Sequence, residues 1–216
     1  MNSTNDHLLH STLPLTRFTR RDFLKLSAAT LALSAFAQAS QPMNILILGG
    51  TGFIGPHQVE AALGRGHRVT IFNRGLSASE VLGVEMLIGD RNSDLSALEG
   101  RTWDAVIDNS RSNPDWVRKT TSLLKGSVTQ YLYVSSISVY ANPSVKGITE
   151  TGELQPPAPV DADPDNLRHY GGLKVRCEQI TQDAFPQSHT IVRPSLIVGP
   201  GDPTDRFTYW LSLIHI

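Results

Sequence analysis

A short apolar run, Asn44 to Leu48, leads directly into the glycine-rich sequence Gly49-Gly50-Thr51-Gly52-Phe53-Ile54-Gly55, and residues 55–63 are compatible with a helix. Such a turn between a strand and a helix suits a pyrophosphate group. Glycine lets the backbone approach the phosphates, and the helix N-terminus offers free N–H groups and partial positive charge. A tight turn without a ligand is the alternative. The residues expected to contact the ligand are Gly49, Gly52, Phe53, Ile54 and Gly55.

Strand-like apolar runs alternate with helix-compatible segments along the rest of the chain. We expect strands at residues 44–48, 68–72, 84–88, 105–108, 130–135 and 189–192, and helices at residues 55–63, 115–124 and 170–184. This alternation predicts an α/β fold with a doubly wound parallel sheet of the Rossmann type. The stretch between Ala141 and Leu167 is rich in proline and lacks periodicity, and connections of that length are commonly functional.

The end of the second predicted strand bears on which cofactor the turn would hold. A site selective for NAD usually places an acid there, about 20 residues after the turn, on the adenosine ribose. This chain has Asn73 and Arg74 instead, so no carboxylate repels a 2′-phosphate and an arginine can bind one. We expect NADP or NAD, with NADP favoured. Asp90 is a candidate partner of the adenine amine, and a solvated loop carboxylate is the alternative.

The sequence Tyr170-Gly171-Gly172-Leu173-Lys174 places a phenol and an ammonium four residues apart. That spacing puts both groups on one face of a helix, so they can act on one ligand. A phenol with an ordinary pKa of about 10 needs a nearby cation to act as a base near neutral pH. Lys174 is the expected cation for Tyr170. A surface tyrosine beside a solvated lysine is the alternative.

Hydroxyl groups follow the fifth predicted strand, in the sequence Ser135-Ser136-Ile137-Ser138-Val139-Tyr140. Ligands of open α/β sheets bind at this carboxyl edge. We expect Ser136 to hold a substrate oxygen against Tyr170, whereas Ser135 and Ser138 are expected to satisfy backbone groups at the end of the strand. The chain has no G-x-S-x-G elbow, which argues against a hydrolase nucleophile.

Together these motifs resemble the extended short-chain dehydrogenase/reductase family, in particular its NAD-dependent epimerase/dehydratase members. The resemblance covers Met43 to about Trp210 and includes a further motif, Arg193-Pro194-Ser195-Leu196-Ile197-Val198-Gly199-Pro200-Gly201. It implies that Ser136, Tyr170 and Lys174 form a catalytic triad, with Tyr170 as acid/base and Lys174 also bonding the nicotinamide ribose. It also implies hydride transfer between a substrate carbon and the nicotinamide.

The resemblance leaves the substrate open. After the fourth strand many sugar-nucleotide epimerases carry a histidine and small residues, whereas this chain has Asp108-Asn109-Ser110-Arg111. Residues 109–113 are expected either to line the nicotinamide pocket or to form a plain polar loop. Family members continue into a smaller C-terminal substrate domain, which we expect to be truncated after residues 43–210. Residues 211–216 resemble translated sequencing-adapter sequence, so we expect them to be non-native. Relatives often dimerise through a helix bundle that includes the Tyr170 helix.

Residues 1–39 have the features of an export signal. The sequence Thr19-Arg20-Arg21-Asp22-Phe23-Leu24-Lys25 resembles the twin-arginine motif, and an apolar run from Leu26 to Ala37 follows it. That run is too short and too rich in alanine and serine to span a bilayer stably. We expect cleavage after Ala39, contact with the twin-arginine export machinery, and a periplasmic or otherwise exported protein. A basic amphipathic helix is the alternative.

Charge and cysteine content argue against several classes of partner. Lys and Arg total 19 against 20 Asp and Glu, so no positive excess exists to bind nucleic acid or an anionic membrane. The single cysteine, Cys177, cannot form an internal disulfide and is expected to be a small buried residue. The histidines show no ligand spacing, so no metal site is expected. A small-molecule substrate is the expected partner.

Export and cofactor use together favour an epimerase or dehydratase, which would act on a hydroxyl or keto group of a small, sugar-like molecule. The periplasm should hold little free NADP, and such an enzyme returns the hydride to the same substrate and leaves its cofactor as it began. Two other functions stay open. One is an NADP-dependent carbonyl reductase, which the same triad would serve, and the other is a non-catalytic Rossmann protein that binds a cofactor or RNA.

Overall fold

The computed structural model describes residues 41–76 and 83–204, and the described residues form a six-stranded parallel sheet. The order of the strands in the sheet is β3-β2-β1-β4-β5-β6, and all neighbours run parallel. The strands are β1 (Asn44–Leu48), β2 (Arg68–Asn73), β3 (Glu85–Ile88), β4 (Trp103–Asp108), β5 (Val128–Val134) and β6 (His189–Val192). This topology confirms the predicted Rossmann-type α/β fold. The expected export signal at 1–39 and the terminal residues 211–216 lie outside the described residues.

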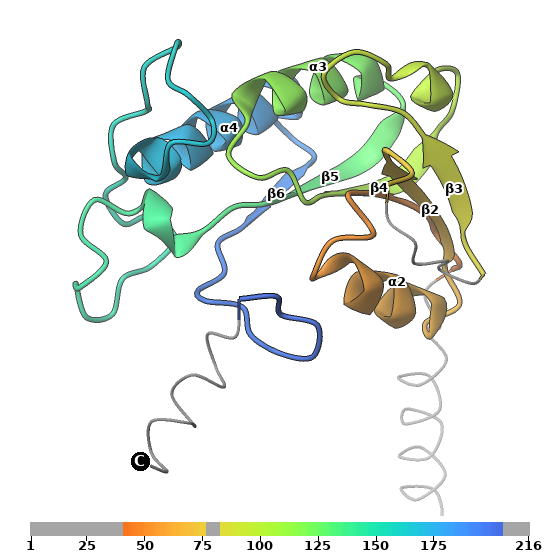
Figure 1. The fold of residues 1–216 in the computed structure, drawn as a ribbon, viewed down its shortest axis with the longest axis horizontal. Coiled ribbons are helices and arrows are strands. Elements are labelled where there is room, and N and C mark those ends of the chain that lie inside the picture. Colours follow the sequence, from red (N-terminus) through yellow and green to blue (C-terminus); the bar gives the residue numbers. More distant parts are fainter. Residues whose placement is uncertain (1–40, 77–82, 205–216) are drawn as a thin grey trace, which may run out of the picture. The chain divides into compact units, whose positions relative to one another are not determined.

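Helices cover both faces of the sheet. Figure 1 shows α3 (Pro114–Leu124) and α4 (Tyr170–Ala184) on one face and α2 (Gly55–Leu63) on the other. The described residues also form three short 3-10 helices: η1 (Ser96–Leu98), η2 (Ile137–Val139) and η3 (Leu167–His169). The winding direction reverses between β1 and β4, and in open α/β sheets ligands bind beyond the carboxyl ends of the strands at such a point. Among residues 41–76 and 83–204, no helix is long and apolar enough to cross a membrane.

The central strand β1 shows how the sequence builds a core on each face. Leu46 and Leu48 are fully buried in the core beneath α3 and α4, whereas Ile45 and Ile47 pack in the core on the side of α2, with Val59. Successive side chains of a strand point to opposite faces, so a strand covered on both sides reads as a continuous apolar run. Each such side chain stabilises the fold by about 1.5–3 kcal/mol when it leaves water.

The predicted bounds of β1, α2, α4 and β6 agree with the structure, whereas two central strands differ. β4 and β5 each begin two residues earlier than predicted, at Trp103 and Val128. These two residues are paired in register, which extends both strands at once. Pairing of this kind depends on the neighbouring strand, so periodicity within one segment does not reveal it. β5 ends at Val134, which places Ser135 just beyond the strand.

The proline-rich stretch between β5 and α4 lies against α4 and is held there by hydrogen bonds. The amide of Ala158 donates to the Gly172 carbonyl oxygen at 3.0 Å, and Arg176 Nε donates to the Ala158 carbonyl oxygen at 3.0 Å. Gln155 Nε2 donates to the carbonyl oxygen of Ser138, at 2.8 Å. The stretch therefore ties the first turns of α4 to η2, which follows β5.

Candidate nucleotide and catalytic site

The turn after β1 needs glycine for different reasons at different positions. Gly49 has a φ of +85°, in the left-handed region. A Cβ on Gly55 would lie 2.4 Å from the Gly50 carbonyl group, and one on Gly50 would lie 2.5 Å from Ile71 Cγ2. At Gly52 the nearest atom to such a Cβ is the Gly49 oxygen at 3.6 Å, so the protein itself leaves room there. Space that the fold does not fill is what close approach of a phosphate requires.

Two cavities lie at the carboxyl edge of the sheet and share two lining residues. The first has a volume of about 550 Å³ and lies between the glycine turn and the ends of β2 and β3. The second, of about 510 Å³, lies between the ends of β4 and β5 and the start of α4. Asn109 and Arg111, just after β4, line both cavities. The two cavities together form a site that extends across the switch point between β1 and β4.

The first cavity contains the residues predicted to bind the adenosine half of a dinucleotide. Asn73, Arg74 and Asp90 all line it, with Gly49 and Gly52. Asn73 accepts a hydrogen bond from the amide of Gly75 at 2.7 Å through Oδ1, while its buried Nδ2 has no hydrogen-bond partner in the described structure. A buried amide nitrogen without an acceptor is costly unless a ligand supplies one. Asn73 therefore offers a donor to a ribose hydroxyl or a phosphate oxygen.

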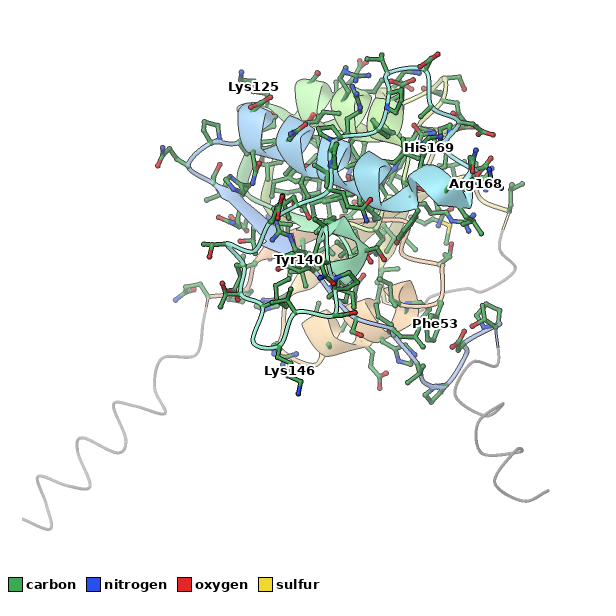
Figure 2. All side chains as sticks on the ribbon, turned by 90° about the vertical axis from the view of Figure 1, so that its left-hand side faces the viewer. Phe53, Lys125, Tyr140, Lys146, Arg168 and His169 are labelled. Atoms are coloured by element: carbon green, nitrogen blue, oxygen red, sulfur yellow. The ribbon has the colours of Figure 1, made fainter. Side chains whose placement is uncertain are left out.

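Phe53 and Ile54 are placed differently from the glycines of the turn. Both line the second cavity and not the first. Figure 2 shows Phe53 beside the segment that follows β6, and His57 Nε2 lies 3.0 Å from the Pro200 carbonyl oxygen in the same segment. The predicted residues therefore divide between the two ends of the site.

Ser136, Tyr170 and Lys174 all line the second cavity, although they come from different segments. Ser136 caps η2, where its Oγ accepts a hydrogen bond from the amide of Ser138 at 3.1 Å. Tyr170 is the first residue of α4. At Gly171, next to Tyr170, no side chain fits, because a Cβ there would lie 2.3 Å from the Ser138 carbonyl oxygen. Close packing of α4 against η2 brings the three candidate residues to one cavity.

Lys174 is buried, and its ammonium has three hydrogen-bond acceptors. Nζ donates to the carbonyl oxygens of Ser110 and Val134 at 2.8 and 2.9 Å and to the phenol oxygen of Tyr133 at 3.1 Å. Burial lowers the pKa of Lys174 to about 8, although the carboxylates of Asp108 and Glu178 act to raise it. Lys174 is therefore mostly protonated at neutral pH and loses its proton only slightly above it. No hydrogen bond joins Lys174 to Tyr170 in the described part of the chain.

A polar cluster beside the second cavity corrects one expectation. Ser135 does not serve a backbone group but donates to the Glu178 carboxylate at 2.5 Å. Arg193 donates to both oxygens of the same carboxylate, at 3.0 and 2.7 Å, and its guanidinium lies 5.1 Å from the ring centroid of Tyr140. Ser138, in contrast, receives a hydrogen bond from Ser136 through its own Oγ. The hydroxyls after β5 thus have distinct partners that local sequence does not show.

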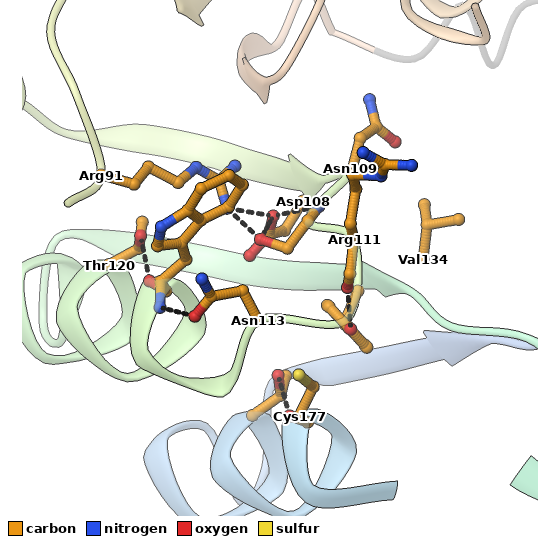
Figure 3. Close-up of polar contacts among 12 residues, drawn as sticks. Arg91, Asp108, Asn109, Arg111, Asn113, Thr120, Val134 and Cys177 are labelled. Carbon is orange, nitrogen blue, oxygen red and sulfur yellow. Dashed lines mark hydrogen bonds and ion pairs between the residues drawn. The ribbon is translucent and has the colours of Figure 1, made fainter. Parts of the chain in front are cut away.

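The structure also brings to the site residues that the sequence analysis missed. Arg91 and Trp116 line the first cavity, and the Arg91 guanidinium lies 5.9 Å from the Trp116 ring centroid. Arg91 donates to Asp108 Oδ1 at 2.8 Å, as Figure 3 shows. The only available signal was that Asp108-Asn109-Ser110-Arg111 departs from the sugar-nucleotide epimerase pattern. Asn109 and Arg111 do line the cavities, which favours the pocket interpretation of this segment.

Cys177 is a buried free cysteine. Burial raises the pKa of the Cys177 thiol to about 11, which keeps the thiol protonated, as expected for a small buried residue. Within residues 41–76 and 83–204 no group of three or more His, Cys, Asp and Glu side chains is placed to hold a metal ion.

The parallel sheet, the glycine turn and the cavities at the switch point define a nucleotide-binding protein of the Rossmann class. The sequence profile of the NAD dependent epimerase/dehydratase family matches residues 45–215. The chain therefore belongs to this family, which is characterised by NAD-type cofactors.

Similar proteins span several functions. The chain is 30% identical to the chloroplast stem-loop binding protein of 41 kDa b from Arabidopsis thaliana, over 76% of this chain and 45% of that protein. It is 28% identical to the bifunctional pinoresinol-lariciresinol reductase of Thuja plicata, over 72% of this chain and 50% of that protein. The chain thus spans about half the length of the curated relatives it matches.

Solved structures support the fold. A UDP-galactose 4-epimerase superimposes with a TM-score of 0.61 at 20% identity, covering 80% of this chain and 63% of that chain. The hexosamine 5,6-dehydratase TunA, described as NAD dependent, gives a TM-score of 0.59 at 22% identity, with 78% and 60% covered. At these levels of identity the likeness concerns the arrangement of strands and helices.

Proposed function

We propose that this protein is an NAD(P)-dependent epimerase/dehydratase that acts on a hydroxyl or keto group of a small, sugar-like substrate. One observation carries the proposal. Ser136, Tyr170 and Lys174 line a single cavity that adjoins the dinucleotide cavity through Asn109 and Arg111. A substrate in the second cavity would therefore lie beside the reactive end of a cofactor bound along both.

The residues of the first cavity fit a dinucleotide. Gly52 leaves space for a phosphate, and the buried Nδ2 of Asn73 lacks an acceptor that a ribose or its phosphate would provide. Asn73 and Arg74 carry no negative charge and Arg74 lines the same cavity, which supports a preference for NADP over NAD. We propose NADP as the favoured cofactor on this ground.

Each catalytic candidate has a defined task in this proposal. A bound nicotinamide would supply the acceptor, and in the reverse step the donor, of the hydride from the substrate carbon. Tyr170 moves a proton at its phenol oxygen to or from the substrate oxygen, and Ser136 Oγ donates a hydrogen bond to that oxygen. Lys174 favours the Tyr170 phenolate through its charge. A bond from Lys174 to the nicotinamide ribose would require Nζ to exchange one of its three present acceptors.

The experiment that tests the proposal begins with the purified chain and its bound nucleotides. Mass analysis should detect NADP or NAD, and sugar nucleotides such as UDP-galactose should then be screened for conversion. We expect steady conversion without net change in nicotinamide absorbance, because an epimerase or dehydratase leaves its cofactor as it began. A folded chain that binds neither cofactor would contradict the proposal.

A carbonyl reductase that uses NADP is the second candidate, and the similarity to the reductase of Thuja plicata favours it. The same triad would reduce a ketone, but each turnover would oxidise one NADPH. Loss of absorbance at the nicotinamide wavelength in proportion to product would identify this function. It would also replace the epimerase proposal.

A non-catalytic binding protein is the candidate from another class, and the stem-loop binding protein of Arabidopsis thaliana favours it. The net charge of −1 argues against it, because RNA binding generally relies on cations that neutralise phosphates. A gel-shift assay with a stem-loop RNA at physiological salt separates the two. We expect no shift from this chain.

We also propose export through the twin-arginine pathway, which rests on the sequence of residues 1–39 alone. The double variant Arg20→Lys with Arg21→Lys should keep the protein in the cytoplasm, whereas Arg17→Lys should not. Cell fractionation of a bacterial host measures both. Equal export of both variants would contradict the proposal.

We further propose a homodimer that buries part of α4. Light scattering of the purified chain should then give twice the mass of 23.6 kDa, or of its processed form. A monomeric mass at high protein concentration would contradict the dimer.

A further inference from the structure

Asp108, at the end of β4, is a fully buried carboxylate that the proposed reaction does not use. It accepts hydrogen bonds from four donors. Arg91 Nη1 and the Ser110 amide lie 2.8 Å from Oδ1, Ser110 Oγ lies 2.5 Å from Oδ1, and the Tyr131 hydroxyl lies 2.6 Å from Oδ2. Arg91 also donates to Ser110 Oγ. Figure 3 shows the contact between this carboxylate and Arg91.

The charge of Asp108 survives burial because its partners favour the ionised form. Burial acts to raise its pKa, but the Arg91 charge and the hydrogen bonds from Ser110, Tyr131 and Arg91 outweigh burial and lower it. A buried carboxylate with one cation and three neutral donors is satisfied at both oxygens. Asp108 is therefore a fixed negative charge inside the domain.

The Ser110 turn connects this charge to the catalytic lysine. Asp108 Oδ1 holds the turn from one side, through the amide and the hydroxyl of Ser110. The carbonyl oxygen of Ser110 accepts the hydrogen bond from Lys174 Nζ at 2.8 Å on the other side. Ser110 is 3% exposed and Lys174 is 3% exposed, so water does not compete for these bonds. The position of this carbonyl depends on Asp108.

We propose that Asp108 is a positioning residue, which fixes the Ser110 carbonyl against Lys174 and supplies the charge that keeps Lys174 an ammonium in the cavity. The inference rests on the proposed function, in which the Lys174 ammonium acts on Tyr170 and on the cofactor. Asp108 contacts neither Tyr170 nor the expected cofactor position. It acts through Ser110, in the segment where this chain departs from the sugar-nucleotide epimerase pattern.

Other charged and titratable groups face Lys174 and must be kept constant in a test. Cys177 and Glu178 lie on α4, and Tyr133 lies on β5. The Cys177 thiol, with a pKa raised by burial to about 11, stays neutral in the range where Lys174 titrates. Glu178 is bound by Arg193 and Ser135. A change in the titration of Lys174 on substitution of Asp108 can therefore be assigned to Asp108.

The experiment measures the titration of Lys174 by NMR of full-length chain labelled with ¹³C at lysine Cε. The other lysines are Lys25, Lys119, Lys125 and Lys146, so Lys174→Met identifies the signal of interest. In the isosteric variant Asp108→Asn we expect the midpoint of Lys174 to fall by about one pH unit, a tenfold change in its protonation equilibrium. We also expect the affinity for NADP at pH 7.5 to fall about threefold to tenfold.

A matched pair of variants separates positioning from stability. Ser110→Ala and Tyr131→Phe each remove one hydroxyl from the same carboxylate, but only Ser110 lies on the path to Lys174. Ser110→Ala should lower the midpoint of Lys174 by roughly half a unit, about threefold. Tyr131→Phe should leave it unchanged. If Asp108→Asn does not fold, these two variants still test whether the Asp108–Ser110 contact affects Lys174.

An unchanged Lys174 midpoint in folded Asp108→Asn, or equal midpoints in Ser110→Ala and Tyr131→Phe, would overturn the inference. The titration needs no substrate, so it is independent of the proposed function. If the wild-type chain binds no NADP or NAD, the proposed function fails while the lysine titration still decides the role of Asp108.

Discussion

The ammonium of Lys174 donates a hydrogen bond to the phenol oxygen of Tyr133 at 3.1 Å and lies 4.8 Å from the centroid of the same ring. Tyr133 thus forms one wall of the lysine site and contributes one of its acceptors. The hydroxyl of Tyr133 also donates to the carbonyl oxygen of Arg111 at 3.2 Å, at the junction of the two cavities. Lys174 is therefore held by the same strand ends that form the cavities.

Tyr170→Phe should abolish turnover while leaving cofactor binding intact. Removing the phenol oxygen removes the proposed acid/base, a contribution of about 10²–10⁴ in rate. Tyr140→Phe is the matched control, because its hydroxyl contacts Arg193 outside the cavity lining. Turnover assays and NADP titrations measure both variants. Equal loss in the two, or none in Tyr170→Phe, would remove Tyr170 from the mechanism.

Gly52→Ala should weaken cofactor binding without harming the fold. Its added Cβ finds only one atom within 4 Å, at 3.6 Å, but it enters the space expected for the phosphates. We expect at least about a tenfold loss of NADP affinity, or about 1.4 kcal/mol. Gly55→Ala is the contrast, because its Cβ would lie 2.4 Å from the Gly50 backbone and should lower stability first. Unchanged NADP affinity in Gly52→Ala would place the phosphates elsewhere.

Arg74→Gln should reduce the preference for NADP over NAD. The guanidinium is expected to bind the 2′-phosphate, and its removal should cost about 1–3 kcal/mol of NADP affinity with little change for NAD. Isothermal titration with each cofactor gives the ratio. Arg65→Gln is the control, since Arg65 bonds the Ala61 carbonyl oxygen on α2 and does not line the cavity. A wild-type chain that prefers NAD would contradict the assignment of Arg74.

Stability should rise between pH 8 and pH 9 because of Lys174. Burial lowers its folded-state pKa from 10.5 to about 8, so the unfolded chain binds a proton there that the folded chain has lost. The unfolding free energy then increases with pH by about 1 kcal/mol over this interval. The buried Cys177 thiol partly opposes the rise as the pH approaches 9, because burial raises its pKa from 9.0 to about 11 and the unfolded thiol ionises first. Urea unfolding at both pH values should show the rise in wild type and not in Lys174→Met.

Arg193→Met should destabilise the chain by about 3 kcal/mol, because it leaves the buried Glu178 carboxylate without its cation. Arg101→Met is the control, since its pair with Glu85 is 41% and 50% exposed and contributes at most about 1 kcal/mol. Chemical unfolding of the two variants at one pH gives the comparison. A similar loss of unfolding free energy in both variants would mean that burial does not determine how much the Arg193–Glu178 ion pair stabilises the fold.

Local sequence patterns predict the type of the main strands and helices and their succession along the chain. The continuous apolar run of β1 predicts a strand buried on both faces, and the spacing of Tyr170 and Lys174 predicts their common helix face. These signals are local, because side-chain direction in a strand or helix follows from backbone geometry over a few residues. The glycine turn follows from the local sequence too. The close packing of Gly50 against Ile71 does not, because it depends on the neighbouring strand.

Which polar groups meet depends on how the strands and helices pack. Asp108 accepts a hydrogen bond from Arg91, which follows β3, and Ser135 donates one to Glu178 on α4. Lys174 donates to the carbonyl oxygen of Ser110, 64 residues earlier. These pairs are far apart in sequence and depend on the order of strands in the sheet. A buried charged group pairs with the group that the strand order places near it, because burying an unpaired charge costs a large free energy. The pattern of apolar residues within one segment does not reveal these partners, because the packing of β4, β5 and α4 determines them.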